Sequence, residues 1–272
     1  MGDPNEPLDE DGEFTRGSGS SLPEQSEDSQ VDHGITTPWA FPIFAFVLSL
    51  VTSSIGVIVA SALSGSKLAA SSTTLTEPLL LGSLGGLWVV FFGASLVASH
   101  RWGTGKISHD LGIAIKASDL LVGFVVGVAA QLILVPAIYL AYQFLTGSST
   151  TALSAPAQKL VNSGGGGASE VLVGALIVVG APIVEEIFFR GLTQRSFQYA
   201  TRRMTARVSK LISLLGSSLI FTIAHFEGLQ SFGLFGVALV LGYLAMRNRR
   251  LGTSMVAHAS FNLVSFVALL HH

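Results

Sequence analysis

The sequence contains no cysteine and few charged residues, and both absences restrict what the protein can be. Without cysteine there is no disulfide, no thiolate nucleophile and no cysteine-ligated zinc site. Only 12% of the residues are charged, about half the usual share in soluble domains, whereas 49% are hydrophobic and the mean hydropathy is +0.60. So little charge cannot cover the surface of a soluble domain, and the composition therefore predicts a membrane protein.

The acidic residues are concentrated at the N-terminus. Ten of the 17 lie within the first 32 positions, among Ser, Gly and Pro. Such a segment buries too little apolar surface to fold, so residues 1–37 are predicted to form a disordered acidic tail. It does not resemble a secretory signal peptide, which requires a positively charged start and an early apolar stretch.

Beyond Pro38, one apolar segment after another is long enough to cross a bilayer, which takes about 20 residues. We expect about seven transmembrane helices, and hence an all-α, polytopic membrane bundle. They are predicted at residues 39–63, 79–98, 120–145, 171–186 with an extension, 211–226, 232–246 and 254–270. Residues 38–168 would form the N-terminal transmembrane part and residues 169–272 the C-terminal part.

Basic residues predict the orientation, because short loops rich in Lys and Arg remain in the cytoplasm. Eleven of the 15 lie in three alternate connections: Arg101, Lys106, Lys116, Arg195, Arg202, Arg203, Arg207, Lys210, Arg247, Arg249 and Arg250. The N-terminus is therefore expected in the cytoplasm, in a multi-pass protein of the cell membrane. Topology alone explains these basic residues, so no nucleic-acid partner is expected.

Two adjacent glutamates end the fourth apolar segment, where ionisable side chains are costly and usually functional. Arg190 is spaced to share a helix face with Glu186 and to form a structural ion pair with it. Glu185 points about 100° away around the helix and is left as the less encumbered carboxylate.

Further polar residues lie in later apolar segments: His225, and His258 with Asn262 one helical turn apart. With the glutamates they could hydrolyse an amide without a Ser or Cys nucleophile. Glu185 could deprotonate a water that His225 helps to position, while His258 and Asn262 donate to the oxyanion. A metal such as zinc, held by Glu185, His225 and His258, is an alternative source of the nucleophile, although the usual His-Glu-x-x-His pattern is absent.

Depth along the helices presents a conflict. At 1.5 Å per residue, a helix entering near Val171 places Glu185 toward the cytoplasmic boundary, whereas a helix starting at Ser209 places His225 near the outer face. A shared site requires the fifth helix to begin in the cytoplasm or to continue beyond His225, or the fourth helix to tilt or to kink at Pro182.

Three motifs follow in order over about the last hundred residues: Glu185-Glu186-x-x-x-Arg190, Phe221-x-x-x-His225 and His258-x-x-x-Asn262. Together they resemble the signature of the CPBP family. This family comprises the type II CAAX prenyl endopeptidases and their bacterial relatives, the bacteriocin-processing and bacteriocin-immunity membrane proteins. The chain resembles the bacterial branch.

The resemblance implies an intramembrane endopeptidase whose helical core, residues 169–272, holds the site. It implies the catalytic residues Glu185, Glu186, His225, His258 and Asn262, with Glu185 as the base. Family members have been described both as metalloproteases and as glutamate-dependent proteases, so a divalent metal stays open as a cofactor. The implied partner is a peptide or protein substrate in or near the lipid bilayer.

A non-catalytic membrane protein is the alternative interpretation, for example an immunity factor that binds a bacteriocin or a transporter. The polar cluster would then serve only to pack helices. The Glu185→Gln change separates the two interpretations, since a protease loses cleavage whereas a packing role predicts lost expression or stability.

Overall fold

The computed structural model describes residues 34–65, 76–147, 167–226 and 228–270, apart from the side chains of Ala168 and Leu269. Most of the acidic tail predicted at residues 1–37 lies outside these ranges. Its last four residues are described, and two of them are buried. Ile35 and Thr37 are fully buried, and the Thr36 N–H donates to the Trp102 carbonyl at 2.9 Å. The ordered membrane body therefore begins before residue 38.

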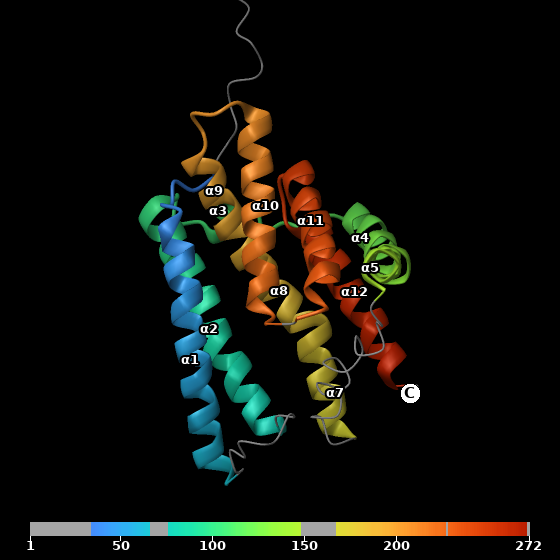
Figure 1. The fold of residues 1–272 in the computed structure, drawn as a ribbon. Coiled ribbons are helices and arrows are strands. Elements are labelled where there is room, and N and C mark those ends of the chain that lie inside the picture. Colours follow the sequence, from blue (N-terminus) through green and yellow to red (C-terminus); the bar gives the residue numbers. More distant parts are fainter. Residues whose placement is uncertain (1–33, 66–75, 148–166, 227, 271–272) are drawn as a thin grey trace, which may run out of the picture. The chain divides into compact units, whose positions relative to one another are not determined.

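Every regular element in the described part of the chain is a helix (Figure 1). They are α1 (Ala40–Ser64), α2 (Glu77–Trp102), α3 (Ile107–Leu111), α4 (Ala117–Ala129), α5 (Val135–Thr146), α7 (Ala168–Ala175), α8 (Ala181–Glu186), α9 (Arg195–Ala200), α10 (Ala206–Ala224), α11 (Ser231–Asn248) and α12 (Gly252–Leu270). Three π-helical segments join some of these into longer helices: η1 (Ala130–Leu134), η3 (Leu176–Gly180) and η4 (Ile187–Gln194).

Six helices among the described residues are long and apolar enough to cross a membrane. They are Ala40–Ser64, Glu77–Trp102, Ala117–Thr146, Ser169–Ala200, Ala206–Ala224 and Ser231–Asn248. The seventh predicted segment is also helical, as α12. The predicted all-α, multi-pass membrane bundle is therefore confirmed.

Two of the π-helical segments end two residues before a proline. Pro136 follows η1 and Pro182 follows η3. Proline has no N–H to donate and its ring clashes with the carbonyl four residues earlier, so the preceding turn cannot keep α-helical bonding. The kink expected at Pro182 is thus a widened turn within a helix that continues to Ala200.

The three connections predicted to carry the basic residues meet at one end of the helices (Figure 1). Arg195 donates to the Asp110 carbonyl at 3.3 Å, and the Leu251 N–H donates to the Gly112 carbonyl at 2.8 Å. This clustering is what the alternation of basic connections requires, and the cytoplasmic assignment of that end stays a prediction.

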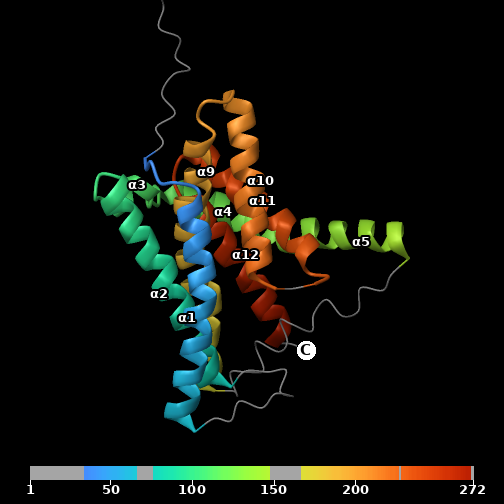
Figure 2. The ribbon, with the colours of Figure 1, turned by 60° about the vertical axis from the view of Figure 1, so that its left-hand side comes forward.

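Helix α12 is packed closely against α4. A Cβ on Gly127 would lie 2.2 Å from the Ala257 carbonyl oxygen, so only glycine permits this approach. Small residues allow such contacts between membrane helices. Helix α4 continues through η1 into α5, as one long helix from Ala117 to Thr146. Its α5 half differs from α4, since none of the α5 residues is buried and α5 points away from the neighbouring helices (Figure 2).

A buried carboxylate secures the start of α12. Asp119 is 1% exposed and accepts hydrogen bonds from the Arg250 guanidinium at 2.7 and 3.1 Å, from the Thr253 hydroxyl at 2.5 Å and from the Lys116 N–H at 2.8 Å. We call Asp119, Arg250 and Thr253 the Asp119 clamp. It fixes the corner between α11 and α12, and its Thr253 lies five residues before His258 in α12.

A second buried carboxylate holds the loop between α2 and α3. Asp110 is fully buried and accepts hydrogen bonds from the Ser99 hydroxyl at 2.6 Å and from the Thr104 N–H and hydroxyl at 2.9 and 2.7 Å. Burial raises the pKa of Asp110, but the donors from Ser99 and Thr104 outweigh it and lower the pKa to about 2. The folded protein therefore stabilises the ionised form.

Asp110→Asn is expected to lower the melting temperature in detergent at pH 7, because the asparagine side chain has one acceptor oxygen where the carboxylate has two. The folded pKa of Asp110 lies below its ordinary value of 3.8, so its stabilisation is present above that value and is lost as the pH falls toward about 2. Melting curves should show the difference between the two proteins shrinking over that range. An unchanged difference at pH 7 and pH 2 would contradict this assignment.

Candidate active site

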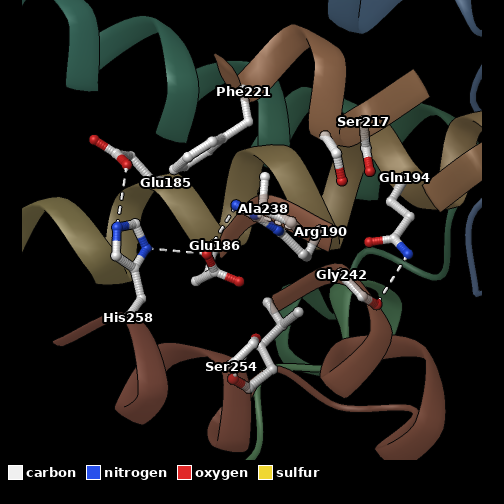
Figure 3. A network of polar contacts seen from close by, with 12 residues as sticks. Glu185, Glu186, Arg190, Gln194, Ser217, Phe221, Ala238, Gly242, Ser254 and His258 are labelled. Carbon is white, nitrogen blue, oxygen red and sulfur yellow. Dashed lines mark hydrogen bonds and ion pairs between the residues drawn. The ribbon is translucent and has the colours of Figure 1, made fainter. Parts of the chain in front are cut away.

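Glu185 and Glu186 lie in α8, the short α-helical stretch between the π-helical segments η3 and η4 (Figure 3). The helix that contains them runs from Ser169 to Ala200, so both carboxylates lie near its middle. This removes the conflict in depth. Figure 1 shows the end of α10, which His225 follows, at the level of α8.

Glu186 forms a buried ion pair with Arg190. The Glu186 Oε1 and Arg190 Nη1 atoms are 2.9 Å apart, and the side chains are 0% and 1% exposed. This is the i,i+4 pair that the spacing suggests. Arg190 also donates to the Ala238 carbonyl of α11 at 3.2 Å, and its guanidinium carbon lies 4.4 Å from the centre of the Phe221 ring.

His258 lies between the two glutamates. Its Nδ1 donates to Glu186 Oε1 at 3.1 Å, and its Nε2 lies 3.8 Å from Glu185 Oε2. The Glu185 side chain is 16% exposed, whereas that of Glu186 is inaccessible. Glu185 is therefore the carboxylate that a small molecule can reach, and one imidazole connects it to the buried pair.

The other two candidates lie around this centre. Asn262, one turn beyond His258, donates its amide N–H to the Ile177 carbonyl at 2.9 Å. That carbonyl belongs to η3, where the helical bonding is irregular. His225 directs Nδ1 to the Phe221 carbonyl at 2.8 Å, and among the described contacts its ring has no bond to either glutamate. The ring of Phe221 lies next to both histidines.

Residues 167–264 match the family model for type II CAAX prenyl endopeptidase, Rce1-like. We call residues 167–264 the Rce1-like domain, after this match. Searches of curated proteins and of solved structures found no significant match. The match contains all the motif residues from Glu185 to Asn262, and it supports a membrane protease of the CAAX type. The Rce1-like domain is formed by α7 to α12.

Two contacts in the Rce1-like domain have no signal in the sequence. His258 and Glu186 are 72 residues apart, and Asn262 and Ile177 are 85 apart, so no helical spacing links them. The sequence predicts only Arg190 as a partner of Glu186. The hydrogen bond from His258 gives Glu186 a second partner. The motif Phe221-x-x-x-His225 indicates that the two side chains share a helix face. It does not indicate which other side chains contact the Phe221 ring.

The alternative prediction is a metal site formed by Glu185, His225 and His258. No three His, Cys, Asp or Glu side chains in the described ranges gather as they would around one ion. Glu185 and His258 are close enough to share an ion, but the contacts of His225 lead to Phe221 instead. The arrangement does not fit a three-ligand site, and we derive no step through a metal.

Arg190→Met should destabilise the protein by about 3–5 kcal/mol, because it leaves the Glu186 carboxylate buried without its cation. Thermal unfolding in detergent measures this. Combining it with Glu186→Gln removes both charges, and the double variant is expected to regain part of the lost stability. A loss below about 0.5 kcal/mol for Arg190→Met alone, the level of a surface substitution, would contradict a buried ion pair.

Proposed function

We propose that this protein is an intramembrane endopeptidase in which Glu185 activates a water molecule for attack on a peptide bond. The observation that carries the proposal is the arrangement of Glu185, His258 and Glu186. One carboxylate is accessible, one is buried, and an imidazole faces both.

The distance between Glu185 and His258 suits a water molecule. Their facing atoms are 3.8 Å apart, too far for a good direct hydrogen bond. A water placed beside them can reach both atoms at about 2.8 Å, the usual length of such bonds. Glu185 then removes the proton of the water as the oxygen attacks the carbonyl carbon, which is general base catalysis.

Glu186 determines what His258 can do. Because Nδ1–H donates to the Glu186 carboxylate, the imidazole is held in a fixed orientation. A protonated His258 presents Nε2–H toward the side of Glu185, where it can donate to the oxyanion of the tetrahedral intermediate. Arg190 keeps Glu186 ionised in this role.

Asn262 and His225 complete the proposed machinery. An amide NH₂ has two donors, and one of those of Asn262 is directed to Ile177, so the other remains for the oxyanion. In His225 the bond from Nδ1 to the Phe221 carbonyl places the acceptor on Nε2. That nitrogen can orient a water or accept a proton, as a helper to Glu185.

The proposed substrate is a peptide or protein in or near the membrane. Glu185 lies near the middle of an apolar helix, so a substrate must reach the site from within the bilayer or through its interface. The Rce1-like match makes a prenylated CAAX peptide the first compound to test.

Glu185→Gln is expected to lower the cleavage rate by a factor of about 100 or more, which is typical for loss of a general base, without lowering the melting temperature. The assay follows a farnesylated CAAX peptide and its unprenylated form in proteoliposomes. Glu170→Gln, the same change in the same long helix, is the matched control and should cleave like the wild type.

A non-catalytic binding or packing role predicts the opposite pattern. The wild type would cleave neither peptide, and Glu185→Gln would lose expression or stability rather than activity. Equal cleavage by the Glu185→Gln and Glu170→Gln variants would overturn the assignment of the base.

A further inference from the structure

We propose that Phe221 is a positioning residue, whose ring holds His258, His225 and Arg190 in the places that hydrolysis requires. The inference rests on the proposed function and extends it to a side chain that takes no part in proton transfer. Phe221 lies in α10, one turn before His225, and is 1% exposed.

Three functional groups surround one aromatic ring. The guanidinium of Arg190 lies over Phe221, 4.4 Å from its centre. The His225 ring lies 4.5 Å away at a tilt of 45°, and the His258 ring lies 5.6 Å away in an edge arrangement of 67°. Figure 3 shows the Phe221 ring reaching toward the side of the site where Glu185 and His258 lie.

These contacts come from three different helices. Arg190 is on η4, His225 follows α10 and His258 is on α12. Among the described contacts His225 has no hydrogen bond to the glutamates, so the Phe221 ring is what connects it to His258. Loss of the ring therefore removes the contact that links the two imidazoles, and it removes one contact of Arg190, which keeps its ion pair with Glu186.

The chemistry of the ring matters in addition to its volume. The face of an aromatic ring attracts a cation, and its edge and face prefer particular orientations of neighbouring rings. Arg190 is thereby held between the ring and Glu186, and a shift of Arg190 changes how Glu186 is shared with His258. An unbranched aliphatic side chain fills a similar space but gives none of these preferences.

Phe189 is a matched residue for comparison. It is also 1% exposed and meets the Phe221 ring at 5.2 Å, and it packs on Phe91 and Phe188. Its described ring contacts are with other phenylalanines only. The same substitution at residues 221 and 189 therefore separates loss of packing from loss of positioning.

The first experiment compares Phe221→Met with Phe189→Met in the proteoliposome assay, with melting temperatures measured in parallel. Phe221→Met should lower kcat by about 10- to 100-fold, as displaced catalytic groups do, while KM changes less than threefold. Phe189→Met should keep kcat within threefold of the wild type at a similar loss of melting temperature. Should Phe221→Met fail to fold, Phe221→Leu and Phe189→Leu replace the pair.

The second experiment does not depend on cleavage. Diethyl pyrocarbonate modifies accessible, unprotonated imidazoles, and mass spectrometry gives the modification rate of each histidine. Removing the ring should raise the rate at both His225 and His258 at least threefold in the Phe221 variant and leave both unchanged in the Phe189 variant.

The two results are read together. Wild-type protein that cleaves neither peptide would remove the proposed function, and the modification rates would still report whether Phe221 positions the histidines. If Phe221→Met and Phe189→Met change kcat or the modification rates equally, Phe221 is only a packing residue and the proposal is overturned.

Discussion

The need to bury charge within apolar helices is the constraint on which the structure of the site depends. An ionised carboxylate at this depth is stable only with a fixed partner. Glu186 has two, Arg190 from its own helix and His258 from α12. Arg190 in turn donates a hydrogen bond to the Ala238 carbonyl of α11 and lies over the ring of Phe221 in α10. Satisfying one carboxylate thus brings four helices of the Rce1-like domain to the same point, and Glu185 is placed beside that point with its side chain accessible.

Features outside the polar cluster keep these helices in place. The Asp119 clamp fixes the start of α12, and Gly127 lets α12 approach α4 closely, so the part of α12 that carries His258 is held against α4. Irregular helical bonding serves the site as well. The widened turn before Pro182 supplies the Ile177 carbonyl to Asn262, which ties α12 to the glutamate-bearing helix one turn beyond His258. Pro182, where the sequence predicts a kink, therefore widens the preceding turn so that a backbone carbonyl accepts a hydrogen bond from another helix.

Contacts within a single helix are the part of the site that residue spacing predicts. Spacing of four residues was enough to suggest the Glu186 and Arg190 pair, and it placed Phe221 with His225 and His258 with Asn262 on shared faces. The same rules misjudged the depth of the fourth helix, because its apolar part ends near Glu186 while the helix itself continues to Ala200 through residues whose polar groups are buried. Thr193 and Gln194 are polar, yet both are buried within η4. The first 33 residues, where an acidic tail is predicted, are not among those described.

The sequence by itself determined the membrane environment, the approximate positions of the helices and the residues that carry charge into them. These depend on composition and on contacts within one helix, which are encoded by neighbouring positions. Only the tertiary structure decided which helix supplies the partner of which carboxylate. The bond between His258 and Glu186 joins positions 72 residues apart, and the contacts of the Phe221 ring depend on how η4, α10 and α12 pack. Packing between membrane helices is set by side-chain shape and by small residues such as Gly127, and these have no fixed spacing that identifies their partners in advance.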